Sequence, residues 1–276
     1  MGVPDASRDA AGRLTTQGYW DRTWRSTSQG QRRVRRLRRR ERLEWDFASV
    51  LGRALDRADR SADPPRVLEI GCANSIWLPY LARERRAVVE GVDFSERGCE
   101  LARENLSAQG LAGTIVCADF FDYAPGARGR FDVVMSCGLV EHFTDIPSVL
   151  RTMAELLRPG GVLFASVPNL VGRYGRAQAM VDASVLAHHV ALTPDDLLSH
   201  ATAAGLRSIE RGYCGGPPRV GSLNPSHARW AGATTARVFA QAAFGIDYAV
   251  SIAARAVRWR PTRTGPFVYV FGETAR

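Results

Sequence analysis

Two acidic side chains and a histidine follow short apolar runs of this chain. Asp93 ends the run 88–92, Asp119 follows the run 114–117, and His142 lies beyond a third run. Such β-branched runs predict buried strands, and ligands of parallel α/β sheets bind where the strands end. Carboxylates there can accept hydrogen bonds from ligand hydroxyls or amines, and an imidazole can take up a proton. The pattern therefore predicts a site for a polar ligand at one edge of a sheet.

The first apolar run ends in a turn with a single glycine. The stretch RVLEIGCANSIW covers residues 66–77, and Ala73 and Ile76 stand where the dinucleotide pattern G-x-G-x-x-G needs its second and third glycines after Gly71. The third glycine of that pattern brings a helix N-terminus close to a pyrophosphate. We therefore expect a ligand without a pyrophosphate, and NAD is disfavoured.

Alternating strands and helices must position these side chains. Helical stretches separate the predicted strands between residues 64 and 168, which is typical of βαβ units in a parallel sheet covered on both faces. LRPGG at 157–161 predicts the turn before the fifth strand, and Thr193 and Pro194 predict the start of a later helix. The expected strands are 67–70, 88–92, 114–117, 131–136, 162–167, 206–213 and 267–271, and the expected helices include 31–59, 77–86, 97–108 and 146–157.

Five motifs, in their order and spacing, resemble those of class I S-adenosylmethionine-dependent methyltransferases. They are VLEIGCANS, VVEGVDFS, CADFFD, FDVVMSCGLVEHF and LRPGGVLFASVPN, and the likeness covers residues 64–169. The resemblance implies an α/β fold with a Rossmann-like, mostly parallel sheet of seven strands, helices on both faces and an antiparallel last strand at 267–271. Against the family's E-x-G-x-G-x-G, Ala73 and Ser75 replace glycines, and Ala73 is small enough for a close backbone approach.

The same resemblance implies S-adenosylmethionine as the cofactor and S-adenosylhomocysteine as its product. Asp93 would accept hydrogen bonds from the ribose hydroxyls, Phe94 would stack on the adenine, and Asp119 would accept from the adenine amine. Asp93 could instead cap a helix, Asp119 could be a plain loop residue, and Glu69 could only brace the turn. The implied cofactor residues are Glu69, Gly71, Cys72, Ala73, Asn74, Asp93, Phe94, Asp119, Phe120, Cys137, Gly138, Tyr19 and Trp24.

Three histidines are candidates for the base that takes a proton from an acceptor. His142 follows the fourth strand beside the expected sulfonium, and His188 and His189 lie in an insertion after the fifth strand. Each could instead be a structural or loop residue. No metal site is expected, because the side chains of adjacent residues such as Glu141 and His142 do not converge on a helix. A nucleophilic Cys137 is not expected, since no motif of cysteine chemistry accompanies it.

The flanking segments suggest a lid and a cap. The apolar stretch 230–259 is either a cap over a hydrophobic acceptor or the surface of a homodimer. In the long first helix, the residues at three- and four-residue spacing predict a buried face, namely Phe47, Val50, Leu51, Ala54, Leu55 and Ala58. We expect a disordered tail at 1–18, an N-terminal helical lid at 19–63, and a methyltransferase domain at 64–276 with insertions at 169–192 and 215–266.

The charge and the cysteines indicate the source and the cellular compartment of the protein. The formal net charge is +9 and every basic residue is arginine, which we interpret as the coding habit of a GC-rich bacterium. The arginine run 32–42 is either a solvated helix face or a contact for an acidic substrate or nucleic acid. Five scattered cysteines without a C-x-x-C pair argue against disulfides and structural zinc. The N-terminus is polar and unlike a secretory signal, and no membrane span is predicted. Together with the cysteines, these features predict a protein of the cytoplasm.

The expected function is methyl transfer to a small, hydrophobic or aromatic acceptor in bacterial natural-product biosynthesis, with oxygen favoured and nitrogen and carbon open. EHF and TPDDLL resemble ubiquinone-type O-methyltransferases and natural-product enzymes, whereas SCGL at 136–139 differs from the D/N-P-P-Y/F of exocyclic-amine N-methyltransferases. One alternative is an RNA or protein methyltransferase that uses the Arg-rich helix, although nucleic acid is not the expected partner. The other is a non-catalytic binding module on the same fold.

Overall fold

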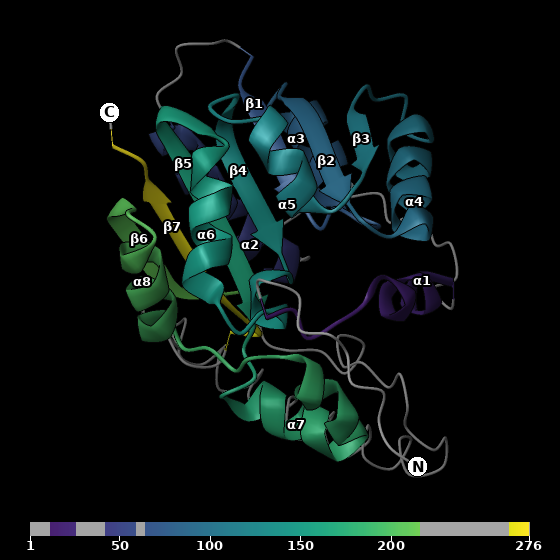
Figure 1. The fold of residues 1–276 in the computed structure, drawn as a ribbon, viewed down its shortest axis with the longest axis vertical. Helices are drawn as coiled ribbons and strands as arrows, with labels where there is room; N and C mark the ends of the chain where they lie inside the picture. Colours follow the sequence, from purple (N-terminus) through teal and green to yellow (C-terminus); the bar gives the residue numbers. More distant parts are fainter. Residues whose placement is uncertain (1–11, 26–41, 59–63, 216–264, 276) are drawn as a thin grey trace.

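A twisted sheet of seven strands forms the centre of the protein in a computed structural model (Figure 1), which describes residues 12–25, 42–58, 64–215 and 265–275. The strand order is β3-β2-β1-β4-β5-β7-β6. Neighbouring strands are parallel except for β7, which is antiparallel to both β5 and β6. The strands are β1 Arg66–Ile70, β2 Val88–Asp93, β3 Thr114–Cys117, β4 Phe131–Cys137, β5 Leu157–Pro168, β6 Arg207–Cys214 and β7 Phe267–Glu273. The predicted fold class and its single antiparallel strand are confirmed.

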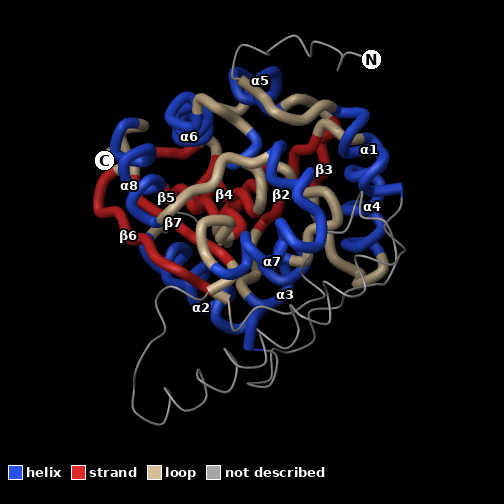
Figure 2. The backbone as a smooth tube through the Cα atoms, turned by 90° about the horizontal axis from the view of Figure 1, so that it is seen from below, coloured by secondary structure: helices blue, strands red, loops and turns tan. Residues whose placement is uncertain are grey.

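Helices cover both faces of the sheet (Figure 2). One face packs against α2, α3 and α4, and the other packs against α5, α6 and α8. The α-helices are α1 Gln17–Arg25, α2 Arg42–Arg57, α3 Trp77–Glu84, α4 Glu96–Ser107, α5 Phe120–Tyr123, α6 Ile146–Glu155, α7 Arg173–Asp182 and α8 Pro194–Ala203. Three short 3₁₀ turns, η1 Ala124–Gly126, η2 Val140–His142 and η3 Ala183–His188, complete the described elements.

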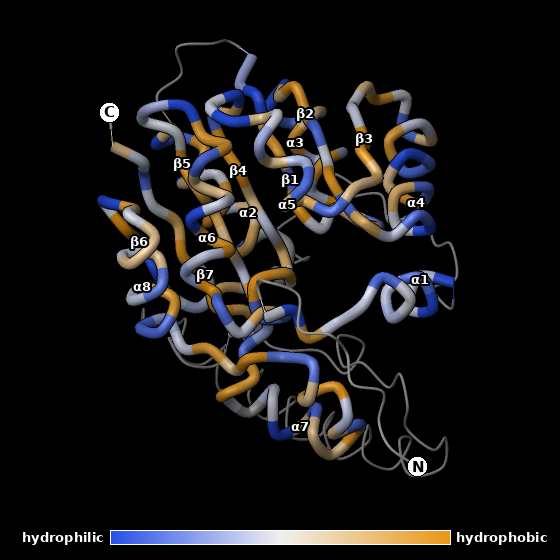
Figure 3. Tube along the Cα trace, viewed as in Figure 1, coloured by the Kyte–Doolittle hydropathy of each residue, from blue (hydrophilic) through white to orange (hydrophobic). Residues whose placement is uncertain are grey.

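The central strands are hydrophobic along their length because both of their faces are covered (Figure 3). In β4, every residue from Phe131 to Ser136 is buried, whereas β3 at the sheet edge exposes Thr114 and Cys117. The chain moves outward from β1 through β2 to β3, then returns to place β4 on the other side of β1. Ligands of such sheets bind outside the carboxyl ends of the strands at this switch point, so the topology positions a site between β1 and β4.

Helix α2 belongs to the core, which corrects the prediction of a lid over the whole stretch 19–63. Its predicted apolar face is buried as expected, with Leu51 and Ala54 fully inaccessible, and Phe47 stacks on Trp77 at 4.4 Å between ring centroids. A helix face of this kind is stable only against another apolar surface, and the sheet supplies it. Helix α1, in contrast, lies away from the sheet and contacts α4 (Figure 1).

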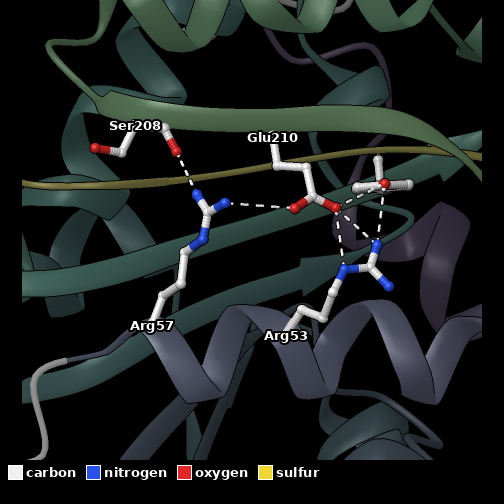
Figure 4. Close-up of polar contacts among 5 residues, drawn as sticks. Arg53, Arg57, Ser208 and Glu210 are labelled. Atoms are coloured by element: carbon white, nitrogen blue, oxygen red, sulfur yellow. Dashed lines mark hydrogen bonds and ion pairs between the residues drawn. The ribbon is translucent and has the colours of Figure 1, made fainter.

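Two arginines of α2 fasten this helix to the sheet edge (Figure 4). Arg53 donates to Glu210 of β6 through Nη2 at 2.7 Å and through Nε at 3.1 Å. The hydroxyl of Tyr269 donates to the same carboxylate at 3.1 Å. Arg57 donates to the Ser208 carbonyl at 2.5 Å. The apolar face of α2 packs on the sheet, and these polar contacts hold the helix in place against β6.

Residues 12–16 differ from the predicted disordered tail. The Leu14 amide donates to the His142 carbonyl at 2.8 Å, the Thr144 amide donates to the Gly12 carbonyl at 3.0 Å, and Arg13 forms an antiparallel bridge with Phe143. These backbone bonds order the segment across the carboxyl edge of the sheet. Residues 1–11, the arginine run at 32–41, and most of the predicted 215–266 insertion, including the cap or dimer stretch 230–259, lie outside the described residues.

The fifth strand begins earlier than expected. LRPGG was expected to form a turn, but β5 already pairs with β4 at Leu157, opposite Phe131. A bulge then shifts the register before Val162 pairs with Val133, and Gly160 takes a positive φ of 74° there. The pairing overrides the turn signal because the bulge accommodates the extra residues. None of the described helices combines the length and apolar character needed to cross a bilayer.

Candidate active site

A pocket with a volume of about 280 Å³ opens at the carboxyl ends of β1, β2 and β4. Its walls come from the turns after these strands and from the segment 12–25, which crosses above them. The residues that line it are Arg13, Thr15, Trp20, Trp24, Ile70, Gly71, Ala73, Val92, Asp93, Phe94, Ala118, Asp119, Phe120, Cys137, Gly138, Leu139, Glu141, His142, Phe143, Pro168 and His189. The lining is mostly apolar, with carboxyl and imidazole groups at separate places.

Ser75 stabilises the turn after β1. Its hydroxyl donates to Glu69 at 2.5 Å and accepts from the amides of Trp77 at 3.0 Å and Leu78 at 3.2 Å. The first two amides of α3 thereby gain hydrogen bonds from Ser75, the residue before the N-cap Ile76, at a position where the methyltransferase pattern has a glycine. Burial raises the pKa of Glu69 to about 8. Glu69 therefore braces the turn and does not line the pocket, which is the alternative reading of this residue.

Ala73 replaces the second glycine of the pattern, and its methyl group fits into the turn. A Cβ added at Gly98, in the first turn of α4, would lie only 2.5 Å from the Ala73 Cβ. The absence of a side chain at Gly98 thus makes the room that Ala73 needs. Gly71 itself has a φ of +74°, a conformation that side chains disfavour, and its amide donates to the Val92 carbonyl at 2.9 Å.

Asp93 connects this turn to the end of β2. One carboxyl oxygen accepts from the Ala73 amide at 3.0 Å, and the other accepts from the Ser95 amide at 2.9 Å. The side chain is 7% exposed, and burial raises its pKa to about 6. Phe94 lies beside it in the pocket wall. Asp93 does not cap α4, because Ser95 is the N-cap residue and accepts from the Gly98 amide at 3.1 Å.

Asp119 caps α5 and pairs with Arg13. It accepts from the Phe121 amide at 3.0 Å, and its other oxygen accepts from Arg13 at 2.5 Å. The Arg13 guanidinium also lies 4.8 Å from the centre of the Phe94 ring. Arg13 therefore stands between the two residues that the resemblance assigns to adenine. Sequence reasoning missed Arg13 because it falls in the predicted tail and no motif marks it.

Two imidazoles of the pocket wall each have one ring nitrogen without a hydrogen. The Nδ1 atom of His142 lies 2.7 Å from the His188 carbonyl, and Nδ1 of His189 lies 2.7 Å from the Val185 carbonyl. A carbonyl only accepts, so each Nδ1 carries the hydrogen and each Nε2 keeps a free lone pair. Burial lowers the pKa of His142 to about 3 and also lowers the pKa of His189. Both rings are therefore neutral at physiological pH.

Glu141 is buried beside these rings. The residue is 1% exposed, and neither carboxyl oxygen has a hydrogen-bond partner among the residues that the structure describes. Burial raises its pKa to about 8. Its Oε1 lies 3.9 Å from Nε2 of His142, so the expectation that these adjacent side chains diverge is wrong. The two residues lie in the single turn η2 and not in an α-helix, and both side chains turn into the pocket.

The pocket brings together most of the predicted site residues. Cys137 and Gly138 line it where β4 ends, and low-polarity surroundings raise the pKa of the Cys137 thiol well above its usual range, which does not favour a nucleophilic thiolate. His188 stacks on Tyr19 at 4.9 Å, outside the lining. Cys72 is fully buried against Gly91 of β2. The predicted residues that do not line the pocket are Glu69, Cys72, Asn74, Tyr19 and His188.

The comparisons with known proteins place the chain in a family. It matches the methyltransferase domain family over residues 36–210 and belongs to that family. The ubiquinone biosynthesis O-methyltransferase of Neisseria meningitidis serogroup A is 34% identical over 118 residues, which cover 42% of this chain and 50% of that protein. The match thus spans about half the length of this curated relative.

Solved structures support the same fold. A SAM-dependent methyltransferase from Archaeoglobus fulgidus has a TM-score of 0.54 and 17% identity, with 83% of this chain and 93% of that chain covered. Phosphoethanolamine N-methyltransferase 2 of Haemonchus contortus, in complex with phosphomonomethylethanolamine and S-adenosylhomocysteine, has a TM-score of 0.53 and 16% identity, with 83% and 53% covered. The predicted class I methyltransferase family and its cofactor, S-adenosylmethionine, are confirmed at the level of the family.

The pocket fits this cofactor. Gly71 leaves the backbone accessible at the end of β1, and Asp93 and Asp119 offer carboxylates where the ribose and the adenine amine would bind. Phe94 and Phe120 add aromatic surface to the same lining. The pocket thus offers acceptors for the ribose and the adenine amine, and aromatic surface for the adenine ring.

Proposed function

We propose that the chain transfers a methyl group from S-adenosylmethionine to an oxygen of a small, hydrophobic or aromatic acceptor. The observation that carries this proposal is that one pocket is lined both by Asp93 and Asp119, which lie at the end of β2 and just after β3, and by the two neutral imidazoles, which follow β4 and η3. Bound S-adenosylmethionine would supply a sulfonium methyl group. An acceptor oxygen would form a bond to that methyl carbon in line with the C–S bond, which would break to release S-adenosylhomocysteine. The name of the relatives, ubiquinone biosynthesis O-methyltransferase, supports oxygen as the acceptor atom.

The chain's own residues would bind and orient the reactants and exclude water from them. Trp20, Trp24 and Phe143 line the pocket with aromatic surface that suits an apolar acceptor and excludes water. In this proposal α1, which lies within the predicted lid 19–63, is the lid over the cofactor. A base must lie within hydrogen-bond reach of the proton that it takes up. In this proposal the acceptor's hydroxyl proton therefore leaves beside Glu141, His142 and His189, which line the pocket.

We also propose a setting in the cytoplasm of a bacterium, in natural-product biosynthesis. All-arginine basicity supports a GC-rich bacterial source, and the five free cysteines support a reducing compartment. A homodimer through 230–259 remains part of the proposal, and light scattering of the full chain tests it. RNA binding through the arginine run is the competing proposal, and a steep loss of RNA binding with added salt would support it.

Titration calorimetry with S-adenosylmethionine, S-adenosylhomocysteine and NAD tests the proposed cofactor. We expect micromolar binding of the first two ligands, none of NAD, and at least a tenfold loss of affinity in Asp93→Ala. Asp195→Ala is the matched control, because Asp195 is a largely exposed acid of α8 away from the pocket. Thermal melts show whether each variant folds. Absence of binding to the folded native chain would contradict the proposal and favour a module with another ligand.

The acceptor is then sought with a panel of phenols, catechols and amines, and turnover is read as S-adenosylhomocysteine formed. We expect turnover with hydroxylated aromatic compounds and not with simple amines. Cofactor binding without turnover on any compound of the panel would favour the non-catalytic binding module.

A further inference from the structure

Three potential metal ligands converge in the pocket. Glu141, His142 and His189 each offer one ligand atom, and these atoms all lie within 4.8 Å of one another. The first two residues belong to η2, and the third follows η3 in the predicted 169–192 insertion. The Val190 amide donates to the Glu141 carbonyl at 2.7 Å, so a backbone bond holds the insertion against η2. The cluster is therefore assembled by the fold from two separate segments.

Both imidazoles are oriented as metal ligands usually are. A ligating histidine commonly donates its second ring N–H to a carbonyl, which fixes the ring and leaves the other nitrogen free for the metal. His142 does so with the His188 carbonyl and His189 with the Val185 carbonyl, both at 2.7 Å. The ring centroids lie 4.4 Å apart. Two adjacent free nitrogens can share one partner that accepts electron pairs, and a cation is such a partner.

Glu141 is an independent indication of a missing partner. Its side chain is buried, lines the pocket, and leaves both carboxyl oxygens without a hydrogen bond to any described residue. Native proteins rarely leave a buried carboxyl group unsatisfied, because its desolvation is costly. A divalent cation at the two Nε2 atoms would also pair with this carboxylate.

The distances between the three ligand atoms are close to those found around a bound metal ion. Ligand atoms at about 2.1 Å from one metal can be at most about 4.2 Å apart. The Glu141 and His142 pair, at 3.9 Å, already meets this limit. The widest separation in the cluster need contract by only about half an ångström, which side-chain rotation can provide. Two imidazoles and one carboxylate are a ligand set of transition metals and not of Mg²⁺ or Ca²⁺.

We propose that Glu141, His142 and His189 form a site for a divalent transition-metal cation whose open positions face the acceptor. The acceptor class would then be a compound with a hydroxyl and a neighbouring oxygen, such as a catechol, that can bind the cation through both oxygens. This part of the inference rests on the proposed methyl transfer. The cation would lower the pKa of the bound hydroxyl, and the released proton would pass to solvent. The two imidazoles then act as ligands and not as bases.

Cobalt(II) binding to the chelator-treated full chain tests the site without any turnover. We expect one ion per chain by calorimetry and visible d–d absorption from the bound cobalt. Glu141→Gln and His189→Ala should each weaken binding at least tenfold. His188→Ala is the matched control, because His142 uses only the backbone carbonyl of that residue, and its cobalt affinity should stay unchanged. Thermal melts and S-adenosylhomocysteine binding show that each variant is folded.

Two results would overturn the site: no stoichiometric cobalt binding by the native chain, or equal cobalt binding by the native chain, Glu141→Gln and His189→Ala. Loss of the site and loss of the proposed function are distinguishable. If S-adenosylhomocysteine binds but cobalt does not, only the metal site is refuted. If cobalt binds at the cluster but S-adenosylhomocysteine does not bind, the site stands and the proposed methyl transfer falls.

Discussion

Ser75 and Glu69 explain how the turn after β1 keeps its shape with fewer glycines than the family pattern. The serine hydroxyl bonds to two amides of α3 and to the buried carboxyl group of Glu69. Since Glu69 is enclosed and lies near Asp93, its neutral form is favoured, and its pKa is raised to about 8 by burial first and by the Asp93 charge in addition. A residue assigned to the cofactor by resemblance thus supports the backbone of a turn that lines the pocket.

The native protein is expected to lose stability as the pH rises, and Glu69→Gln is expected to abolish this loss. The folded chain keeps the Glu69 proton up to about pH 8, whereas the unfolded chain releases it near the ordinary value of 4.5. Between these values the unfolded state binds fewer protons, so the free energy of unfolding falls as the pH rises. Glutamine keeps the acceptor for Ser75 and does not titrate. Thermal melts from about pH 5 to 8 should show a flatter profile for the variant.

The difference between native and variant protein should reach on the order of 3 kcal/mol at about pH 8. Glu104→Gln, an exposed change on α4, is the control and should leave the native profile unaltered. Parallel profiles for native and Glu69→Gln protein would show that Glu69 is ionised throughout and would contradict the enclosed environment described above.

The N-terminal segment and α2 have different tasks although they are neighbours in the sequence. Trp20 lines the pocket, donates through Nε1 to Thr15 at 3.0 Å, and meets the His142 ring edge-on at 5.0 Å. Asp21 of α1 accepts from Ser95 at 2.5 Å, which fixes α1 at the start of α4. Helix α2 instead lies under the sheet and does not reach the pocket lining.

Trp20→Ala should weaken S-adenosylhomocysteine binding roughly tenfold, or about 1.4 kcal/mol, mainly through faster dissociation. The physical reason is the loss of an aromatic wall between the ligand and water. Stopped-flow measurement of the dissociation rate checks it. Tyr19→Phe serves as the control, since Tyr19 stacks on His188 outside the lining. Equal dissociation rates for native protein and Trp20→Ala would mean that α1 is not a lid.

Glu210→Gln should lower the free energy of unfolding by about 1 kcal/mol, because charge-assisted bonds at a partly exposed site are modest. Glu210 accepts from Arg53 at 2.7 Å and pairs with Arg57 at 3.5 Å across α2 and β6 (Figure 4). Urea unfolding measures the change. The affinity for S-adenosylhomocysteine should stay within twofold of the native value, and a larger drop would show that α2 does influence the pocket.

The whole molecule builds one pocket from segments that are distant in the chain. Arg13 and Asp119, which form an ion pair in its wall, are 106 positions apart. The turns after β1, β2 and β4 meet there because the strand order reverses between β1 and β4. A ligand that contacts all of these segments therefore stabilises the folded domain as a unit.

S-adenosylhomocysteine at about 100 times its dissociation constant should stabilise the fold by about 2.7 kcal/mol. For a domain of this size, that corresponds to a rise in Tm of roughly 5–10 °C. Differential scanning calorimetry measures the shift. NAD should produce none, and Asp93→Ala should lose most of it. An equal shift with NAD would show that the pocket does not discriminate against a pyrophosphate.

The local pattern of the sequence was sufficient for the main elements, and the resemblance of its motifs was sufficient for the class of protein. The strands near Val89 and Val134 and the buried face around Leu51 were predictable, because apolar periodicity is a property of neighbouring residues. The position of Asp93 at a strand end, and the single glycine at Gly71, pointed to the ligand class for the same reason. These inferences needed only the order of residues within about one element at a time.

Only the tertiary structure decided which of these residues meet. It separated His188 from His189, placed Arg13 against Asp119, and turned the side chains of Glu141 and His142 toward each other. No short-range pattern encodes such contacts, because they depend on how loops from different strands pack at the sheet edge. Periodicity and turn residues in the sequence determined the elements, and the resemblance of its motifs indicated the family, whereas the packing of remote segments determined the site.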